Sequence, residues 1–144
     1  MAERKVIAEA WLATDEAKSG TLDVIVHIGG NALPEVLELG HHAVASGAKG
    51  IAMFPPTYYR PESVDHLVDL VVQVAREFPK TPFLYYHFPK MNAFNYGCFE
   101  LLRRARDLSP NVVGAKFSDS NMEELKQCCD IGLNMFTGLD EMLA

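Results

Sequence analysis

Residues 83–88 read Phe-Leu-Tyr-Tyr-His-Phe and residues 112–117 read Val-Val-Gly-Ala-Lys-Phe. Both are short and nearly continuous apolar runs, which is typical of strands that are covered on both faces in a parallel sheet. Between them, residues 101–108 place apolar side chains at helical spacing, and Ser109-Pro110 ends that helix. This stretch predicts two parallel strands joined by a helical crossover.

The same alternation continues toward both ends of the chain. Strand-like runs cover residues 22–28, 50–54 and 135–137, and helical patterns cover residues 6–20, 33–47, 61–78 and 120–129. We expect Pro61 and Glu62 in the first turn of their helix, and a capping box from Ser120 to Glu123 at the start of the last helix. Five strands alternate with five helices and no linker divides them, so residues 1–144 are expected to form one α/β domain.

Two architectures fit this alternation: an open doubly wound sheet, or parallel (β/α) units of a TIM barrel. A whole barrel takes ~250 residues, so 144 residues hold about five of its eight units. No G-x-G-x-x-G or G-x-x-x-x-G-K sequence follows any predicted strand, which disfavours the nucleotide-binding open sheets.

The composition excludes several classes of protein. Apolar residues make up 49% and charged residues 22% of the chain, as in a soluble protein with a core, and no apolar run approaches the ~18 residues of a membrane span. The formal charge of −6 argues against nucleic-acid or anionic-membrane partners. The charged N-terminus is not that of a signal peptide. Three cysteines without a C-x-x-C favour a reducing, cytoplasmic location, and Cys98, Cys128 and Cys129 are expected as small buried helix residues.

The histidines do not predict a metal site. His41-His42 is expected on a solvated helix face, whereas His27 and His87, each alone on a predicted strand, are expected to be structural residues with satisfied hydrogen bonds. Histidine and cysteine never repeat at ligand spacing, so no metal and no other cofactor is predicted.

Lys116 is an unusual residue for the end of an apolar strand. With a period of two, its face should also carry Val112, Gly114 and Ser118, and the helix-covered face should carry Val113, Ala115 and Phe117. In a barrel the face of Lys116 is the interior, where lost hydration would lower the pKa of the lysine and leave a neutral amine able to attack a ketone. A lysine that snorkels from the strand end, or that pairs with Asp119, explains the same position equally well.

Two further features lie at the carboxyl ends of strands, the catalytic face of a barrel. The phenol of Tyr86 could relay a proton beside an amine, although an aromatic core residue is the commoner explanation in a run with Phe83, Tyr85 and Phe88. Asp140 and Glu141 bring two carboxylates to the same rim after Gly138. The cap and first turn of a helix explain such carboxylates as well.

Taken together, residues 85–89 (Tyr-Tyr-His-Phe-Pro), 113–119 (Val-Gly-Ala-Lys-Phe-Ser-Asp) and 138–141 (Gly-Leu-Asp-Glu) resemble the animal-type N-acetylneuraminate lyases. These enzymes belong to the dihydrodipicolinate synthase superfamily of pyruvate-dependent class I aldolases. Residues 24–29 and 50–56 match that family in order and spacing, so the resemblance spans essentially the whole chain.

The resemblance implies a role for each matching residue. Lys116 would be the Schiff-base lysine and Tyr86 the proton relay, and the polyhydroxy part of a sugar acid would contact Ser118, Gly138, Asp140 and Glu141. The implied reaction is the reversible cleavage of N-acetylneuraminate to pyruvate and N-acetylmannosamine, without a cofactor or a metal. The implied partners are a small-molecule sugar acid and pyruvate, with no nucleic acid and no membrane, and we expect a homo-oligomer.

The chain departs from the family where the keto acid would be held. The Gly-Thr-Thr/Ser-Gly-Glu loop that binds the pyruvate carboxylate does not occur in the sequence, and the chain corresponds to about strands three to seven of eight. We therefore expect an incomplete barrel. Two alternatives to a sialic acid lyase remain: another pyruvate-dependent aldolase, disfavoured for a dihydrodipicolinate synthase by Met91 where an arginine is expected, and a truncated, non-catalytic half-barrel that self-associates.

Overall fold

A computed structural model describes residues 1–92 and 94–143, and the side chains of all of these except 142 and 143. Five strands form one sheet in the order β1-β2-β3-β4-β5, and every neighbouring pair is parallel. The strands are β1 (Ile25–His27), β2 (Gly50–Met53), β3 (Phe83–His87), β4 (Val112–Phe117) and β5 (Asn134–Thr137). Sequential order in an all-parallel sheet is the order of a (β/α) barrel wall, which confirms the predicted fold class.

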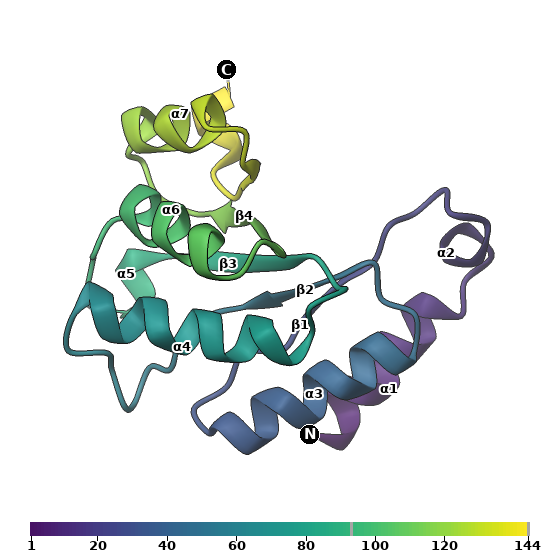
Figure 1. Ribbon diagram of the computed structural model, residues 1–144. Coiled ribbons are helices and arrows are strands. Elements are labelled where there is room, and N and C mark those ends of the chain that lie inside the picture. Colours follow the sequence, from purple (N-terminus) through teal and green to yellow (C-terminus); the bar gives the residue numbers. More distant parts are fainter. Residues whose placement is uncertain (93, 144) are drawn as a thin grey trace.

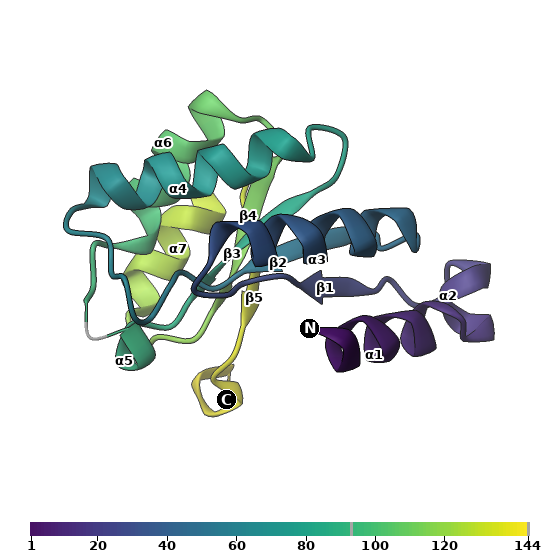
Figure 2. The same ribbon diagram turned by 90° about the horizontal axis from the view of Figure 1, so that it is seen from below.

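Helices follow the strands and cover one side of the sheet (Figures 1 and 2). The helices are α1 (Ala2–Leu12) and α2 (Asp15–Ser19), which precede β1, and then α3 (Leu33–Ala45), α4 (Val64–Glu77), α5 (Pro89–Asn92), α6 (Cys98–Leu108) and α7 (Met122–Asp130), followed by the 3-10 turn η1 (Asp140–Leu143). The core lies between this helical layer and the sheet. On α4, for example, Leu67, Val71 and Val74 are almost completely buried, at about 1.5–3 kcal/mol for each large apolar side chain.

Several helix boundaries differ from those predicted, and each difference has a capping residue as its cause. The α4 helix begins at Val64, because the Ser63 side chain accepts a hydrogen bond from the His66 N–H, so Pro61 and Glu62 precede the helix. In α7 the cap is Asn121, which accepts from the Glu124 N–H, and the predicted Ser120 capping box does not form. Thr14 caps α2 and thereby divides the single helix predicted over residues 6–20.

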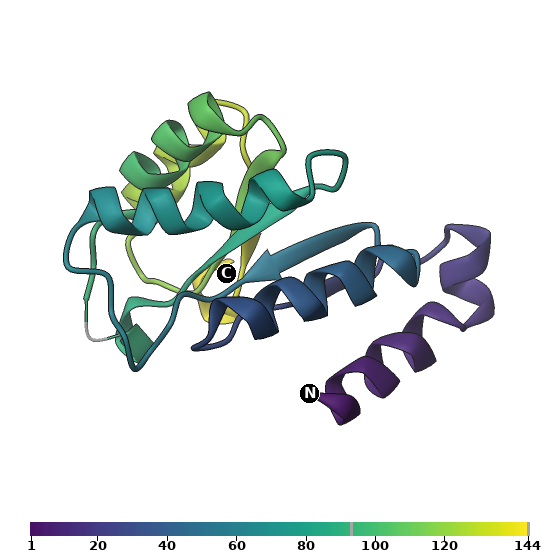
Figure 3. The ribbon, with the colours of Figure 1, turned by 60° about the horizontal axis from the view of Figure 1, so that its bottom comes forward.

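The N-terminal helix lies beside α3, apart from α4, α6 and α7 (Figure 3). The apolar residues that predicted it, Val6, Ile7 and Trp11, are exposed, and Ala8 is its one buried residue. Polar contacts hold α1 in place instead: Arg4 donates to the backbone carbonyls of His27 (2.7 Å) and Gly29 (3.0 Å). These contacts tie α1 to the carboxyl end of β1.

The predicted face alternation in β4 is wrong at its start. The register between β3 and β4 shifts, so that Phe83 pairs with Val112 but Leu84 pairs with Gly114. The extra residue exchanges the faces: Val112 is fully buried in the core on the helix side, and Val113 lies on the opposite side of the sheet. Beyond the shift the alternation holds, with Ala115 and Phe117 in the core and Lys116 on the other face.

Candidate active site

The face of the sheet that the helices leave open carries a hollow of about 320 Å³. Its lining comes from all five strands: Ile25, His27, Ala52, Leu84, Tyr86, Lys116 and Phe136. In a closed barrel this face points to the interior. The lining is mostly apolar with three groups capable of acid–base or nucleophilic chemistry, which is the character of a small-molecule site.

Lys116 and Tyr86 form the chemical centre of this hollow. They are register partners on β4 and β3, and the Lys116 Nζ donates a hydrogen bond of 3.1 Å to the Tyr86 hydroxyl. The same Nζ lies 4.4 Å from the centroid of the Tyr86 ring. A potential nucleophile and a potential proton carrier are thus in direct contact.

Other aromatic rings fix the position of the Tyr86 side chain. Phe54 meets its ring edge-on at 5.4 Å between centroids, Phe88 stacks on it at 6.1 Å, and the His27 ring contacts it at 6.1 Å. Such aromatic pairs have preferred geometries and therefore restrict the rotation of the phenol. The hydroxyl is held toward Lys116.

His27 is a third polar residue of the hollow, and its imidazole is neutral near pH 7. The pKa of His27 is lowered to about 4, first by burial and then by the positive charges of Arg4 and Lys116. Its Nε2 accepts a hydrogen bond from the Phe54 N–H at 3.1 Å, and the Arg4 guanidinium lies 3.4 Å from its Nδ1. The sequence pattern predicted only a structural role for His27. The signal that could have placed it here is its position at the end of a strand, on the same sheet face as Tyr86.

Ser118 and Gly138 meet directly beside Lys116. A Cβ atom on Gly138 would lie 2.1 Å from the Ser118 Oγ and 3.3 Å from the Lys116 Cε, so no side chain fits at position 138 without displacing them. Ser118 is buried, and the Gly138 N–H donates to the Phe117 carbonyl at 2.8 Å. Three of the predicted site residues are therefore brought together.

The two predicted rim carboxylates lie further out. Asp140 and Glu141 are exposed at the start of η1, and within the described part of the chain neither pairs with a basic side chain. They belong to the same edge of the sheet as Gly138 but are not part of the hollow's lining.

The environment of Lys116 differs from the predicted one in burial. Lys116 is exposed, because nothing in the described chain covers the open face, so the expected loss of hydration is absent here. Its alternative partner Asp119 is on the other side of the sheet, 3.5 Å from the His87 Nε2. The strand therefore turns Lys116 toward Tyr86 and away from Asp119.

Two predictions about cysteine and histidine need correction. Cys98 and Cys128 are buried as expected, but Cys129 is exposed because it follows Cys128 on the outer side of α7. His87 is buried, yet its Nε2 has no hydrogen-bond partner among the described residues, so it is not a satisfied structural histidine.

The helices that are described include none that is long and apolar enough to cross a membrane.

Comparison with known proteins places this geometry in a family. Residues 2–144 match the Dihydrodipicolinate synthetase family. The chain belongs to this family. Among curated relatives, N-acetylneuraminate lyase of Gallus gallus is 42% identical over 127 residues, covering 88% of this chain and 40% of the relative. The Homo sapiens N-acetylneuraminate lyase is 37% identical over 131 residues, which cover 90% of this chain and 40% of the relative.

Two solved structures share the fold of this chain. Proteus mirabilis N-acetylneuraminate lyase superposes with a TM-score of 0.88 at 30% identity, over 99% of this chain and 48% of that one. A dihydrodipicolinate synthase superposes with a TM-score of 0.85 at 22% identity, which shows the shared fold alone. The chain spans less than half the length of these relatives.

Proposed function

We propose that this chain carries the Schiff-base half of an N-acetylneuraminate lyase, a pyruvate-dependent class I aldolase. The observation that carries the proposal is the 3.1 Å contact between the Lys116 amine and the Tyr86 hydroxyl on the open, strand-lined face. The names of the relatives support the choice of a sialic acid over other keto acids.

In the proposed reaction Lys116 forms the covalent bond. Its amine adds to the keto carbon of N-acetylneuraminate to give a carbinolamine. Protonation of the carbinolamine hydroxyl, relayed by Tyr86, and loss of water then give an iminium. The iminium nitrogen then accepts the electron pair of the carbon–carbon bond as that bond breaks, which releases N-acetylmannosamine and leaves an enamine. Protonation and hydrolysis of the enamine return pyruvate and the free lysine.

Tyr86 supplies the proton transfers of this cycle. The hydroxyl beside the breaking bond must lose its proton as the aldehyde forms, and the Tyr86 oxygen, which contacts the Lys116 Nζ, is placed to take it. The packed rings of Phe54 and Phe88 keep the phenol oxygen within reach of the Lys116 nitrogen. His27 is neutral and adds no positive charge that would oppose iminium formation.

The sugar chain of the substrate is proposed to lie toward the rim. Ser118 and the space left by Gly138 lie next to Lys116, and Asp140 and Glu141 follow along the same edge. Carboxylates at the rim suit the hydroxyl groups of a polyol as hydrogen-bond donors. The chain has no Gly-Thr-Thr/Ser-Gly-Glu sequence for the pyruvate carboxylate, so turnover by these residues alone is expected to be negligible.

Reductive trapping tests the proposal without requiring turnover. The protein is incubated with pyruvate and borohydride, and its intact mass is measured. We expect one reduced pyruvyl adduct on the unmodified sequence and none on Lys116→Arg, because a guanidinium stays protonated and forms no imine. Lys49→Arg is the matched control, since Lys49 is exposed just before β2 at the opposite end of the sheet. Equal adduct in all three proteins would refute the assignment of Lys116.

A self-associating, non-catalytic scaffold is the second candidate, and the open face favours it. Ile25 and Phe136 are 39% and 49% exposed there, and within the described residues β1 and β5 each pair with one neighbour only. Apolar surface and unpaired parallel edges of this kind are normally covered. A homo-oligomer would cover both the apolar surface and the strand edges. The free cysteines separately suit a reducing compartment such as the cytoplasm. Sedimentation of the purified chain, combined with the trapping result, separates this scaffold from an aldolase.

A further inference from the structure

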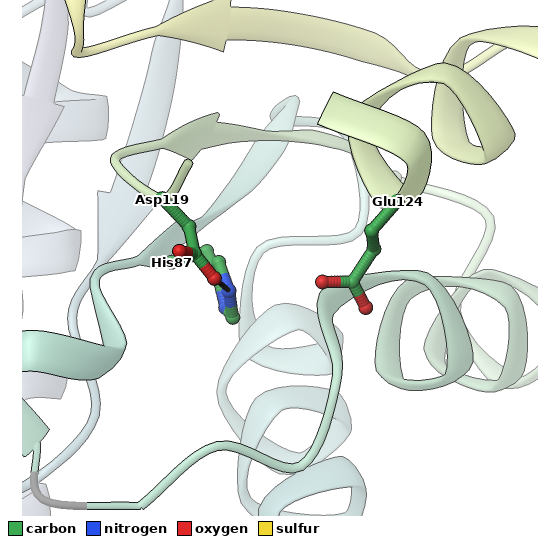
Figure 4. A group of neighbouring side chains, drawn as sticks. All are labelled: His87, Asp119 and Glu124. Carbon is green, nitrogen blue, oxygen red and sulfur yellow. Dashed lines mark ion pairs between the residues drawn. The ribbon is translucent and has the colours of Figure 1, made fainter. Parts of the chain in front are cut away.

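A second polar cluster lies behind the sheet, on the helix-covered side, and the proposed aldolase chemistry does not use it. Among the described residues it consists of His87 at the end of β3, Asp119 in the loop after β4, and Glu124 in the first turn of α7. One ligand-type atom from each residue lies within 4.8 Å of the other two. Figure 4 shows the Glu124 carboxylate directed toward the His87 ring and the Asp119 carboxylate.

The histidine of this cluster has an unused nitrogen. His87 is 4% exposed, and its Nε2 has no hydrogen-bond partner in the described chain. The Asp119 Oδ2 faces this nitrogen at 3.5 Å, but the two atoms do not form a hydrogen bond. A buried polar atom without a partner is costly, and a bound ion is one partner that would satisfy it.

The two carboxylates are held by the backbone in a way that leaves one oxygen free on each. Asp119 Oδ1 accepts from the Ser120 N–H at 2.7 Å, and Glu124 Oε1 accepts from the Phe99 N–H at 3.1 Å. The other oxygens, Asp119 Oδ2 and Glu124 Oε2, accept no hydrogen bond from the described residues. Among those residues no lysine or arginine pairs with either carboxylate. Two partly buried carboxylates therefore face the His87 imidazole without a lysine or arginine partner in the described chain.

We propose that His87, Asp119 and Glu124 form a binding site for a divalent metal ion of the zinc class. One imidazole nitrogen and two carboxylate oxygens are a donor set that such ions take, with water in a fourth position. The separation of 3.5 Å between His87 Nε2 and Asp119 Oδ2 is close to the ~3.4 Å expected for two ligands on a tetrahedral ion. The Glu124 oxygen lies within 4.8 Å of the other two ligand atoms. Rotation about the side-chain bonds of Glu124 would therefore have to bring it closer by at most roughly 1.4 Å to reach the same ligand separation.

The bound ion would join three elements that carry or follow site residues. His87 follows Tyr86 on β3, Asp119 follows Ser118 after β4, and Glu124 lies in the first turn of α7. An ion at this point would fix the carboxyl ends of both strands from behind the sheet. Its role is structural, because it lies on the face opposite to Lys116, and the inference does not depend on the aldolase proposal.

Metal titration of the purified chain tests this site. After treatment with a chelator, Zn²⁺ is added in a calorimeter and Co²⁺ in an absorption cell, and thermal unfolding is followed with and without Zn²⁺. We expect binding of one ion, a Co²⁺ spectrum without the intense band of a thiolate ligand, and a raised unfolding temperature. Glu124→Gln and Asp119→Asn each keep an oxygen for their backbone donor but lose the charge, and each should weaken binding at least about tenfold.

Glu9→Gln is the matched control, since it removes a carboxylate that lies 2.8 Å from His42 on the surface and should leave binding unchanged. Circular dichroism of each variant shows whether it is folded. If Glu124→Gln does not fold, Asp119→Asn provides the test. The proposal is overturned if the chain binds no ion or if both variants bind as tightly as the parent. A thiolate band in the Co²⁺ spectrum would also overturn it, because it would assign the ion to cysteines.

Discussion

The Lys116 amine on β4 donates a hydrogen bond of 3.1 Å to the Tyr86 hydroxyl on β3, and the two residues are register partners in this strand pair. The contact depends on the register shift between Phe83 and Leu84, because without the extra residue in β4 Lys116 would oppose the next residue of β3. A local irregularity of two strands thus sets the chemical pairing of the proposed site.

Replacing Tyr86 by Phe tests the role of the phenol separately from that of the amine. Imine formation needs Lys116, so we expect pyruvate trapping to persist. Exchange of the pyruvate methyl protons with deuterated solvent needs a base beside the imine and should slow by about 10²-fold or more. Nuclear magnetic resonance of the pyruvate methyl signal measures the exchange. Unchanged exchange in Tyr86→Phe would show that the phenol only packs against its aromatic neighbours.

Asp140→Ala tests the proposed sugar subsite. N-acetylneuraminate and pyruvate should both form a borohydride-trapped adduct on Lys116, but only the sugar acid reaches the rim. We expect the yield of its adduct to fall severalfold while the pyruvate adduct stays nearly constant. Asp23→Ala, an exposed carboxylate before β1 at the other end of the sheet, should change neither. Equal loss of both adducts in Asp140→Ala would indicate a structural role for this residue.

Gly138→Ala tests the close packing beside the lysine. The backbone of Gly138 does not have a positive φ, so the cost comes from the 2.1 Å approach of the new Cβ to the Ser118 Oγ. We expect the free energy of unfolding in urea to fall by about 1–3 kcal/mol. In a Ser118→Ala background the Oγ is absent, and the nearest atom of residue 118 to the new Cβ is the residue's own Cβ, at 3.2 Å. Most of the loss should therefore disappear. A loss of equal size in both backgrounds would contradict the packing described.

The pKa of His27 predicts a dependence of stability on pH. The unfolded chain takes up this proton near the ordinary pKa of 6.5, and the folded chain takes it up only near 4. Folding is therefore weakened as the pH falls from 6.5 to 4, and the effect is complete below that window. Because His27 is partly exposed, we expect a loss on the order of 1 kcal/mol. Urea unfolding across this window should show a smaller loss for His27→Gln, whereas an identical loss would refute the assignment.

Phe136→Glu tests whether the open face mediates self-association. We expect the parent chain to sediment as an oligomer, most simply a symmetric dimer, and this variant to shift toward monomer. Leu108→Glu is the matched control, because Leu108 on α6 is also 49% exposed but lies in the helical layer. A parent chain that sediments as a single monomeric species would contradict the prediction.

Much of this architecture could be predicted from the sequence, because apolar periodicity decides where strands and helices lie. The all-parallel sheet followed from unbroken apolar runs, and the position of Lys116 opposite the helices followed from the residues just before it. The meeting of Lys116 with Tyr86 could be expected only in general terms, since both stand at strand ends. The relatives carry names that agree with the proposed lyase.

The remaining features depend on contacts between segments that are distant in sequence. Nothing local shows that Val112 and Val113 exchange faces, because that exchange arises from pairing with Phe83. The exposure of Ile7 and Trp11 depends on what α1 packs against and not on its helical pattern. The cluster of His87, Asp119 and Glu124 escaped a search for ligand spacing, because three separate elements contribute one residue each.

Peptide mapping after reductive trapping with pyruvate tests the central claim most directly, because it identifies which lysine has reacted. The candidates are Lys5, Lys18, Lys49, Lys80, Lys90, Lys116 and Lys126. Of the lysines in the described chain, Lys116 is the one that donates to a tyrosine hydroxyl on the open face, so we expect the reduced pyruvyl group on the peptide containing Lys116 and on no other. An adduct spread over the surface lysines, or no adduct at any of them, would contradict it.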